Sequence, residues 1–98
     1  MGESVPASVE IGDSVIYQSL QDEVVILNMT SQEYYGLDNV GASMWKMLID
    51  RRDIATVAEC MVKEYEVDGD TLRGDLHTLV RQLLDAGLLK PAEVEVVR

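Results

Sequence analysis

The stretch EYYGLDNVGASMWKML, residues 33–48, decides the fold because it changes from a strand pattern to a helix pattern with almost nothing between. Its two tyrosines, glycine and leucine predict a strand. The side chain of Asp38 or Asn39 can then accept hydrogen bonds from the first free N–H groups of a helix over about 40–50. That helix carries the only tryptophan, Trp45. The stretch therefore predicts an aromatic strand joined directly to an apolar helix.

Two more strands precede this one. The segment SVIYQSL, residues 14–20, is rich in β-branched and aromatic residues, and EVVILNM, residues 23–29, is apolar on both faces. The second pattern is typical of a central strand. The polar pairs at 21–22 and 30–31 are short enough for tight turns, and the third strand covers 32–37. We therefore expect an antiparallel meander whose third strand lies at the edge.

Two helices follow the tryptophan helix, which is apolar on two sides and is expected to pack between two layers. From Ile54 to Tyr65 apolar residues recur at i, i+3, i+4, i+7, i+8 and i+11, a strong amphipathic pattern. The last helix can be capped by Asp68 or Asp70, and it ends at about Ala86, before the C-terminal cap residue Gly87. The order βββααα predicts an α+β fold of the winged helix-turn-helix type.

The 98 residues predict a single domain over 1–98, with an ordered core over about 12–89 and loosely held ends at 1–8 and 92–98. Leu88 and Leu89 are expected to fold back onto that core. No apolar run approaches the roughly 18 residues that span a membrane. The N-terminus lacks the basic start and apolar centre of a secretory signal. We therefore expect a cytoplasmic protein without a membrane partner.

Eighteen acidic residues and eight basic residues give a net charge of −10. Phosphate backbones are bound mainly through lysine and arginine, so this balance argues against nucleic acid, although the predicted fold is often used for it. The last helix shows the conflict, because it carries only Arg73 and Arg81 against Asp70, Asp75 and Asp85. The charge suits a basic or neutral partner, or serves solubility alone.

Residues that carry out catalysis are scarce. His77 is the only histidine and Cys60 the only cysteine, so the sequence offers neither a disulfide framework nor a multi-cysteine metal cluster. The acidic run at 67–75 lacks the further oxygen ligand and closing glutamate of a calcium loop. Gly36 and Gly41 do not form a dinucleotide or phosphate loop. We predict no catalytic residue, no metal site and no cofactor, and so a protein that is not an enzyme.

The order and spacing of these features resemble the PqqD-like family, the small leader-peptide-binding domains called RiPP recognition elements. The shared pattern is an apolar strand, an aromatic strand ending in Leu-Asn, a Gly-Ala pair, a tryptophan helix, and a last helix with an early aspartate and a closing Gly-Leu. Here the corresponding residues are Val24–Leu27, Tyr34–Asp38, Gly41-Ala42, Trp45, Asp75 and Gly87-Leu88. The resemblance covers about 12–89, and Leu37-Asp38 departs from Leu-Asn while keeping a capping side chain.

This resemblance implies that the domain binds the leader region of a ribosomally made precursor peptide and delivers it to a processing enzyme. The leader is held as an added strand along the third strand, beside the last helix. The chain is similar in size both to the partner of the leader protease in lasso peptide synthesis and to the partner of the radical-SAM enzyme in pyrroloquinoline quinone synthesis. The DAGLL and YYGLD segments are closer to the lasso type.

An exposed edge strand offers unpaired N–H and C=O groups that an extended peptide can satisfy. Backbone pairing is predicted to involve Gln32, Glu33, Tyr34, Tyr35 and Gly36. The other wall of the groove is predicted to come from the last helix, through Leu72, Asp75, Leu76, Leu79, Val80 and Leu83. About half of that leucine stripe is expected to pack only the core, and Asp75 either pairs locally or meets a basic leader residue. Strand alternation places Tyr35 and Leu37 on the core face and Tyr34 on the opposite face.

Two other interpretations remain open at this point. A non-catalytic adaptor subunit would dock helix to helix through the face of Trp45 and Ile49. A flat exposed edge could also pair with a second copy, so the protein is expected to be a monomer or an edge-paired dimer.

Overall fold

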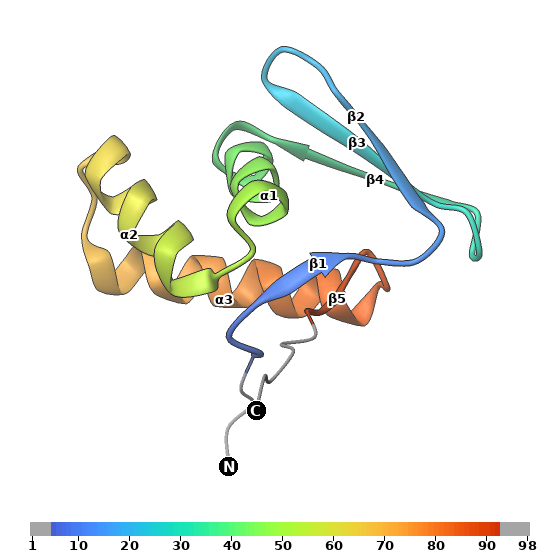
Figure 1. Cartoon of the computed structure of the whole chain (residues 1–98). Helices are drawn as coiled ribbons and strands as arrows, with labels where there is room; N and C mark the ends of the chain where they lie inside the picture. Colours follow the sequence, from blue (N-terminus) through green and yellow to red (C-terminus); the bar gives the residue numbers. More distant parts are fainter. Residues whose placement is uncertain (1–4, 93–98) are drawn as a thin grey trace, which may run out of the picture.

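The computed structural model describes residues 5–92. In chain order its elements are β1 (Val9–Ile11), β2 (Val15–Ser19), β3 (Glu23–Asn28), β4 (Glu33–Asp38), α1 (Asn39–Arg51), α2 (Ile54–Tyr65), α3 (Gly69–Asp85) and β5 (Leu89–Pro91) (Figure 1). The antiparallel sheet β2-β3-β4 followed by three helices confirms the predicted α+β fold. A second, two-stranded ladder of β1 and β5 was not predicted.

The β2–β3 hairpin has the tight turn that Gln21 and Asp22 predict, because the N–H of Leu20 donates to the carbonyl of Glu23 over 2.8 Å. In β3, Val24 and Ile26 are buried toward the helices, while Val25 and Leu27 alternate with them and are half-buried on the outer face of the sheet. A strand that is apolar on both faces therefore lies in the middle of the sheet, as predicted.

The turn between β3 and β4 is longer than the sequence suggests. Gln32, predicted as the first residue of the third strand, has a left-handed φ of 64° and donates its N–H to the carbonyl of Asn28 over 2.7 Å. It therefore closes the turn, and β4 begins one residue later at Glu33. The prediction of a two-residue turn at 30–31 is therefore wrong. The connection covers residues 29–32, and it is closed by the hydrogen bond from Gln32 to Asn28.

The junction between β4 and α1 differs from the predicted cap. Asp38 stands at the N-cap position but its side chain makes no capping hydrogen bond. Asn39 instead adopts a left-handed φ of 50°, and its N–H donates to the carbonyl of Asp22 over 3.0 Å. Asparagine tolerates this conformation better than most residues. The turn of the first hairpin therefore fixes the point where the chain passes from strand to helix.

Helix α1 packs between two layers, as its two apolar sides predict. It contacts β3 and β4 on one side and α2 and β1 on another (Figure 1). Trp45 is fully buried, and the ring of Tyr17 from β2 meets it edge-on at a centroid distance of 5.5 Å. The single tryptophan therefore lies in the contact between α1 and the sheet.

Helices α2 and α3 begin at aspartate caps. The carboxylate of Asp68 accepts from the backbone N–H of Thr71 over 3.0 Å, which confirms the predicted cap of α3. Asp53 does the same for α2 through the N–H of Thr56, a cap that was not predicted. At the other end of α3, Gly87 has the left-handed φ of 76° expected of a C-terminal cap residue.

The N-terminal part of the chain packs into the core from before residue 12, where the predicted core begins. Within the end predicted to be loose, the carbonyls of Ala7 and Ser8 accept from the N–H groups of Ile54 and Ala92 over 2.9 and 3.0 Å. Val9 is fully buried, and β1 pairs with β5 from Val9↔Pro91 to Ile11↔Leu89. Leu88 and Leu89 are buried, as predicted. Residues 1–4 and 93–98 lie outside the described range. Strands β1 and β5 were not predicted because three residues are too few to show the alternation of a strand in the sequence.

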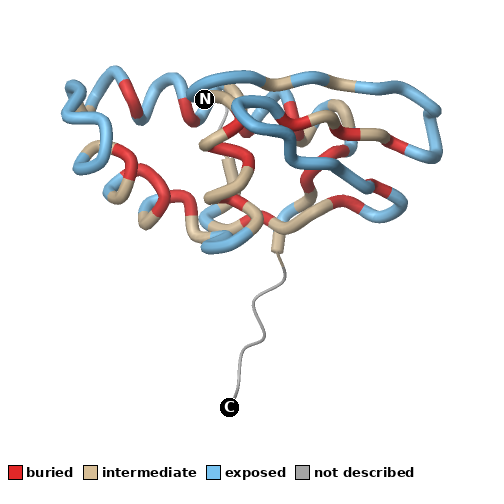
Figure 2. Tube along the Cα trace, turned by 90° about the horizontal axis from the view of Figure 1, so that it is seen from above, coloured by how far each residue is buried: buried red, intermediate tan, exposed pale blue. Residues whose placement is uncertain are grey.

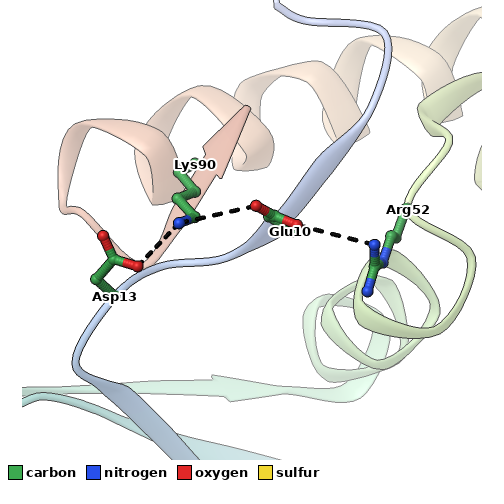
Figure 3. Close-up of polar contacts among 4 residues, drawn as sticks. All are labelled: Glu10, Asp13, Arg52 and Lys90. Atoms are coloured by element: carbon green, nitrogen blue, oxygen red, sulfur yellow. Dashed lines mark hydrogen bonds and ion pairs between the residues drawn. The ribbon is translucent and has the colours of Figure 1, made fainter. Parts of the chain in front are cut away.

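Charged side chains surround this small ladder. Lys90 lies 2.8 Å from Asp13 and 3.7 Å from Glu10, and the other carboxylate oxygen of Glu10 is 3.8 Å from Arg52 (Figure 3). The chain of ion pairs joins β5, β1 and the corner between α1 and α2. Because these side chains are partly exposed, each pair contributes little to stability.

One buried amide links the sheet to the last helix. The side chain of Asn28 donates to the carbonyl of Ala86 over 3.0 Å. Its oxygen accepts from the N–H groups of Thr30 and Ser31 over 3.0 and 3.2 Å. Asn28 is the buried polar residue of the described chain, with 8% of its surface exposed. It therefore holds the turn before β4 against the C-terminal end of α3.

Replacing Asn28 tests this link. Asn28→Ala leaves the carbonyl of Ala86 and two turn N–H groups without their partner, and we expect the free energy of unfolding to fall by about 1–3 kcal/mol. Urea unfolding followed by the fluorescence of Trp45 measures the change. Gln18→Ala on the exposed outer face is the control and should stay within about 0.5 kcal/mol of the wild type. Equal stability of Asn28→Ala and wild type would contradict the proposed role.

The two caps predict the response to acid. The hydroxyl and backbone N–H of Thr56 lower the pKa of Asp53 below 3.8, and the backbone N–H and hydroxyl of Thr71 do the same for Asp68. A lowered pKa in the folded state gives stability that is present above the unfolded value and is lost as the pH falls through the folded value. An Asp53→Asn, Asp68→Asn variant keeps the caps without the titration. Its melting temperature should therefore fall less than that of the wild type below about pH 4. Equal losses in both proteins would show that the caps do not contribute to the acid response.

Candidate functional site

Strand β4 forms a free edge of the sheet, since the order β2-β3-β4 leaves its far side without a strand among residues 5–92. In an antiparallel ladder, directly opposed residues alternate between hydrogen-bonded and non-bonded pairs. The bond from Asn39 to Asp22 sets this alternation. The residues of β4 that bond to β3 are therefore Glu33, Tyr35 and Leu37.

The backbone groups of Tyr34, Gly36 and Asp38 consequently face outward from the edge. Of the five residues predicted to pair with a peptide, Tyr34 and Gly36 have groups available for pairing. Glu33 and Tyr35 use theirs within the sheet, and Gln32 donates its N–H inside the turn. A side chain at Gly36 would meet no atom within 4 Å, so the outer face of the sheet is open at this residue. Of the predicted backbone contacts, the structure therefore leaves those of Tyr34 and Gly36 available to a peptide.

Burial alternates along β4 as the sequence predicts (Figure 2). Tyr34 points to the outer face and is 71% exposed, whereas Tyr35 and Leu37 are half-buried and pack against the core. The hydroxyl of Tyr35 donates to Glu33 over 2.8 Å. That hydrogen bond, with partial burial and the negative charge of Glu33, raises the pKa of Tyr35 above 10.0. Strand β4 therefore carries one tyrosine on the outer face of the sheet and one on the face that packs against the helices.

The predicted wall on α3 divides into buried and accessible residues. Of its six members, four are almost fully buried in the core: Leu72, Leu76, Val80 and Leu83. They support the helix from beneath and leave no exposed side-chain surface for a ligand. Leu79 is only partly buried and Asp75 is exposed. The accessible flank of α3 thus consists of Asp75 and Leu79, which lie one helical turn apart on one side of the core stripe.

The link between Asn28 and Ala86 brings this flank toward the start of β4. Ala86 follows Leu79 along the same side of α3, and Asn28 pairs with Glu33, the first residue of β4. The edge strand and the accessible side of the helix therefore converge near the β3–β4 turn. This is the arrangement that capture of a peptide between strand and helix requires.

Two further exposed apolar residues lie where the edge runs into the helices. Val40 in the first turn of α1 is 42% exposed and Tyr65 at the end of α2 is 37% exposed. The hydroxyl of Tyr65 donates to Ser43, one turn after Val40, over 2.8 Å. Sequence reasoning missed both residues as surface groups, because each fits the apolar pattern of its own helix. They extend the apolar surface beyond the end of β4.

The described residues contain no group of three or more histidine, cysteine, aspartate or glutamate side chains that could hold a metal ion. His77 is exposed and lines a cleft with Arg73 and Arg81 on the flank of α3 away from Leu79. Cys60 is a half-buried free thiol. None of the helices in 5–92 is long and apolar enough to cross a membrane. The β4 edge itself presents main-chain N–H and C=O groups with apolar side chains beside them.

Comparisons with known proteins find one family and two similar structures. The family model described as coenzyme PQQ synthesis protein D (PqqD) matches residues 23–89. The structure of TbiB1 in complex with the TbiA(beta) leader peptide has a TM-score of 0.80 and 32% identity, covering 87% of this chain and 99% of that one. Lasso peptide synthetase B1 complexed with the leader peptide has a TM-score of 0.77 and 27% identity, covering 87% of this chain and 100% of that one. No curated protein matches the chain significantly.

Proline substitutions test the direction of the backbone groups in β4. Tyr34→Pro removes an outward-facing N–H and leaves the ladder intact, so we expect a folded protein with a small loss of stability. Tyr35→Pro removes an N–H that bonds to β3 and leaves a ladder carbonyl without its donor, which should cost about 1–3 kcal/mol. Thermal unfolding by circular dichroism compares the two variants. A larger loss in Tyr34→Pro than in Tyr35→Pro would reverse the assignment of the edge.

Proposed function

The chain belongs to the PqqD family, and from that premise we propose that it is a RiPP recognition element that binds the leader region of a ribosomally made precursor peptide. The observation that carries the proposal is the free edge of β4, with the backbone groups of Tyr34, Gly36 and Asp38 facing outward. An extended peptide satisfies such groups by joining the sheet as a further strand. The leader-peptide complexes of both similar structures support this assignment.

A bound leader would alternate its side chains between two environments. Those on the outer face lie beside Tyr34, and those on the helix side lie toward Leu79 and Asp75. Acidic groups at Glu33, Asp38 and Asp75 favour a leader with basic residues at the positions that face them. Main-chain pairing supplies the affinity, and these side-chain contacts supply the selectivity.

The protein would act as an adaptor that delivers the precursor to a processing enzyme, without chemistry of its own. The similarity to lasso peptide synthetase B1 favours the leader protease of lasso peptide synthesis as that enzyme. The match to the PqqD model keeps a radical-SAM enzyme as the second candidate. Because precursors of this kind are made on ribosomes, we place the protein in the cytoplasm.

An adaptor that docks through the face of Trp45 and Ile49 is disfavoured. Trp45 is fully buried between α1 and the sheet, and Ile49 is partly buried against the core. A partner helix could reach this face only if the sheet moved away from α1. The β4 edge needs no such rearrangement.

Titration of the isotope-labelled protein with the leader of a precursor from the same gene cluster tests the proposal. We expect NMR shifts along 33–38 and at Asp75 and Leu79, together with slowed hydrogen exchange at the amides of Tyr34 and Gly36. Slowed exchange is the mark of strand addition, because these amides gain a partner only in the complex. Leader binding without protection of these amides would contradict strand addition.

A matched pair of substitutions on α3 tests the helix wall. Leu79→Glu places a charge in the proposed groove and should weaken leader binding at least about tenfold. Thr78→Glu places the same charge at the neighbouring residue, which is exposed and points away from the core stripe, and should leave the affinity within about twofold. Calorimetry measures both, and equal losses would remove the α3 flank from the site.

A further inference from the structure

The sheet has a second free edge, at β2. The N–H of Leu20 donates to Glu23 and that of Met29 donates to Ser14, which sets the bonded pairs between β2 and β3. By the same alternation as in β4, the remaining residues of β2 turn their backbone groups away from β3. These residues are Val15, Tyr17 and Ser19. Within 5–92 no strand pairs with them.

This edge lacks the features that keep edge strands from pairing. Natural sheets protect their edges with charged residues, proline, bulges or covering elements. The segment 14–20, SVIYQSL, contains neither a charge nor a proline. Every residue over 16–23 is exposed (Figure 2). By contrast, β4 carries Glu33 and Asp38. An unprotected edge of this kind indicates that something covers it.

The surface beside this edge is apolar. Ile16, Tyr17 and Leu20 are 52%, 40% and 44% exposed. A shallow hollow of about 430 Å³ crosses the outer face of the sheet, and it is lined by Ile16, Tyr17, Gln18, Val25, Leu27 and Tyr34. Exposed apolar surface that is continuous over several strands marks an interaction site. The hollow reaches from β2 to Tyr34, so it borders the proposed leader site.

We propose that the β2 edge docks an extended segment of the enzyme that processes the precursor. This inference rests on the proposed function, and it names the surface through which delivery occurs. The segment pairs with the outward groups of Val15, Tyr17 and Ser19 and places apolar side chains in the hollow. Asp22 and Glu23 follow the strand at one end. Complementary charge therefore calls for basic residues beside the apolar part of the segment.

A second copy of this chain is a poorer occupant. In antiparallel self-pairing centred on Tyr17, β2 of one copy offers no basic residue to Asp22 and Glu23 of the other. Each copy also has a net charge of −10, so two copies repel each other. Charge therefore favours a different, basic partner over a dimer.

The leader and the enzyme can be bound at the same time. The leader on β4 and the enzyme on β2 occupy opposite edges of one three-stranded sheet, so neither blocks the other. Leader side chains on the outer face lie beside Tyr34, at the rim of the hollow that the enzyme covers. The enzyme can therefore contact both the protein and the bound leader, and it should bind more tightly when the leader is present.

The experiment uses the full chain, the leader peptide and the processing enzyme from the same gene cluster. Ser19→Pro removes one outward N–H from the β2 edge, and Ser19→Ala is its matched control. Ile16→Lys places a protecting charge on the outer face and tests the same edge should Ser19→Pro unfold. Leader affinity is measured by fluorescence anisotropy and enzyme affinity by calorimetry. The melting temperature of each variant reports whether it is folded.

We expect Ser19→Pro and Ile16→Lys to weaken enzyme binding at least about tenfold while leader affinity stays within about twofold. Ser19→Ala should behave as wild type in both assays. Unchanged enzyme binding in folded variants would overturn the docking surface and leave leader binding intact. A wild-type protein that binds the enzyme but not the leader would instead reject the proposed function alone. A wild-type dimer dispersed by Ile16→Lys would make a second copy the occupant and also overturn the proposal.

Discussion

The side-chain amide of Asn28 is the constraint on which the proposed site depends. It donates to the carbonyl of Ala86 at the end of α3 and accepts from two N–H groups of the turn that starts β4. Only a side chain with both a donor and an acceptor can make these bonds, so aspartate and leucine are not equivalent there. One buried polar group therefore links the turn before the edge strand to the end of α3.

The surrounding backbone leaves little freedom to change this junction. Gly87 has a φ of 76°, and a Cβ there would lie 3.2 Å from the amide nitrogen of Asn28. A Cβ on Gly12 would collide with the carbonyl of Gly87. The loop before β2, the end of α3 and the end of β3 thus meet where side chains are small or hydrogen-bonded. Because these three segments pack closely at this point, the sheet is held against the end of α3.

The helices cover only one face of the sheet, and this asymmetry gives the molecule its exposed surfaces. The inner residues Val24 and Ile26 pack against the helices, while Ile16 and Tyr34 on the outer face remain open to solvent. Both edges also present unpaired backbone groups, but only β4 carries acidic residues. A small sheet with two unlike edges can hold two extended segments without their competing. The net charge of −10 helps to keep such a surface from pairing with itself.

Much of the fold follows from the sequence by itself. The period of α2, the alternation of β4 and the cap residues Asp68 and Gly87 are local properties. The order of the three-stranded sheet and the three helices, and the orientation of Tyr34 and Tyr35, were therefore predicted correctly. Tertiary structure decided what local patterns do not contain. Helix α3 has one apolar stripe, but only packing shows that Leu76 and Val80 are buried while Leu79 remains accessible.

The same distinction explains the other differences. Strands β1 and β5 exist because residues about eighty positions apart meet, and the role of Asn28 depends on a partner 58 residues away. The left-handed Gln32 and Asn39 are held by hydrogen bonds to Asn28 and Asp22. The sequence thus determined the elements and their faces, because these depend on neighbours in the chain. Only the tertiary structure determined which backbone groups remain free, because each is free or bonded according to contacts that form when distant segments pack together.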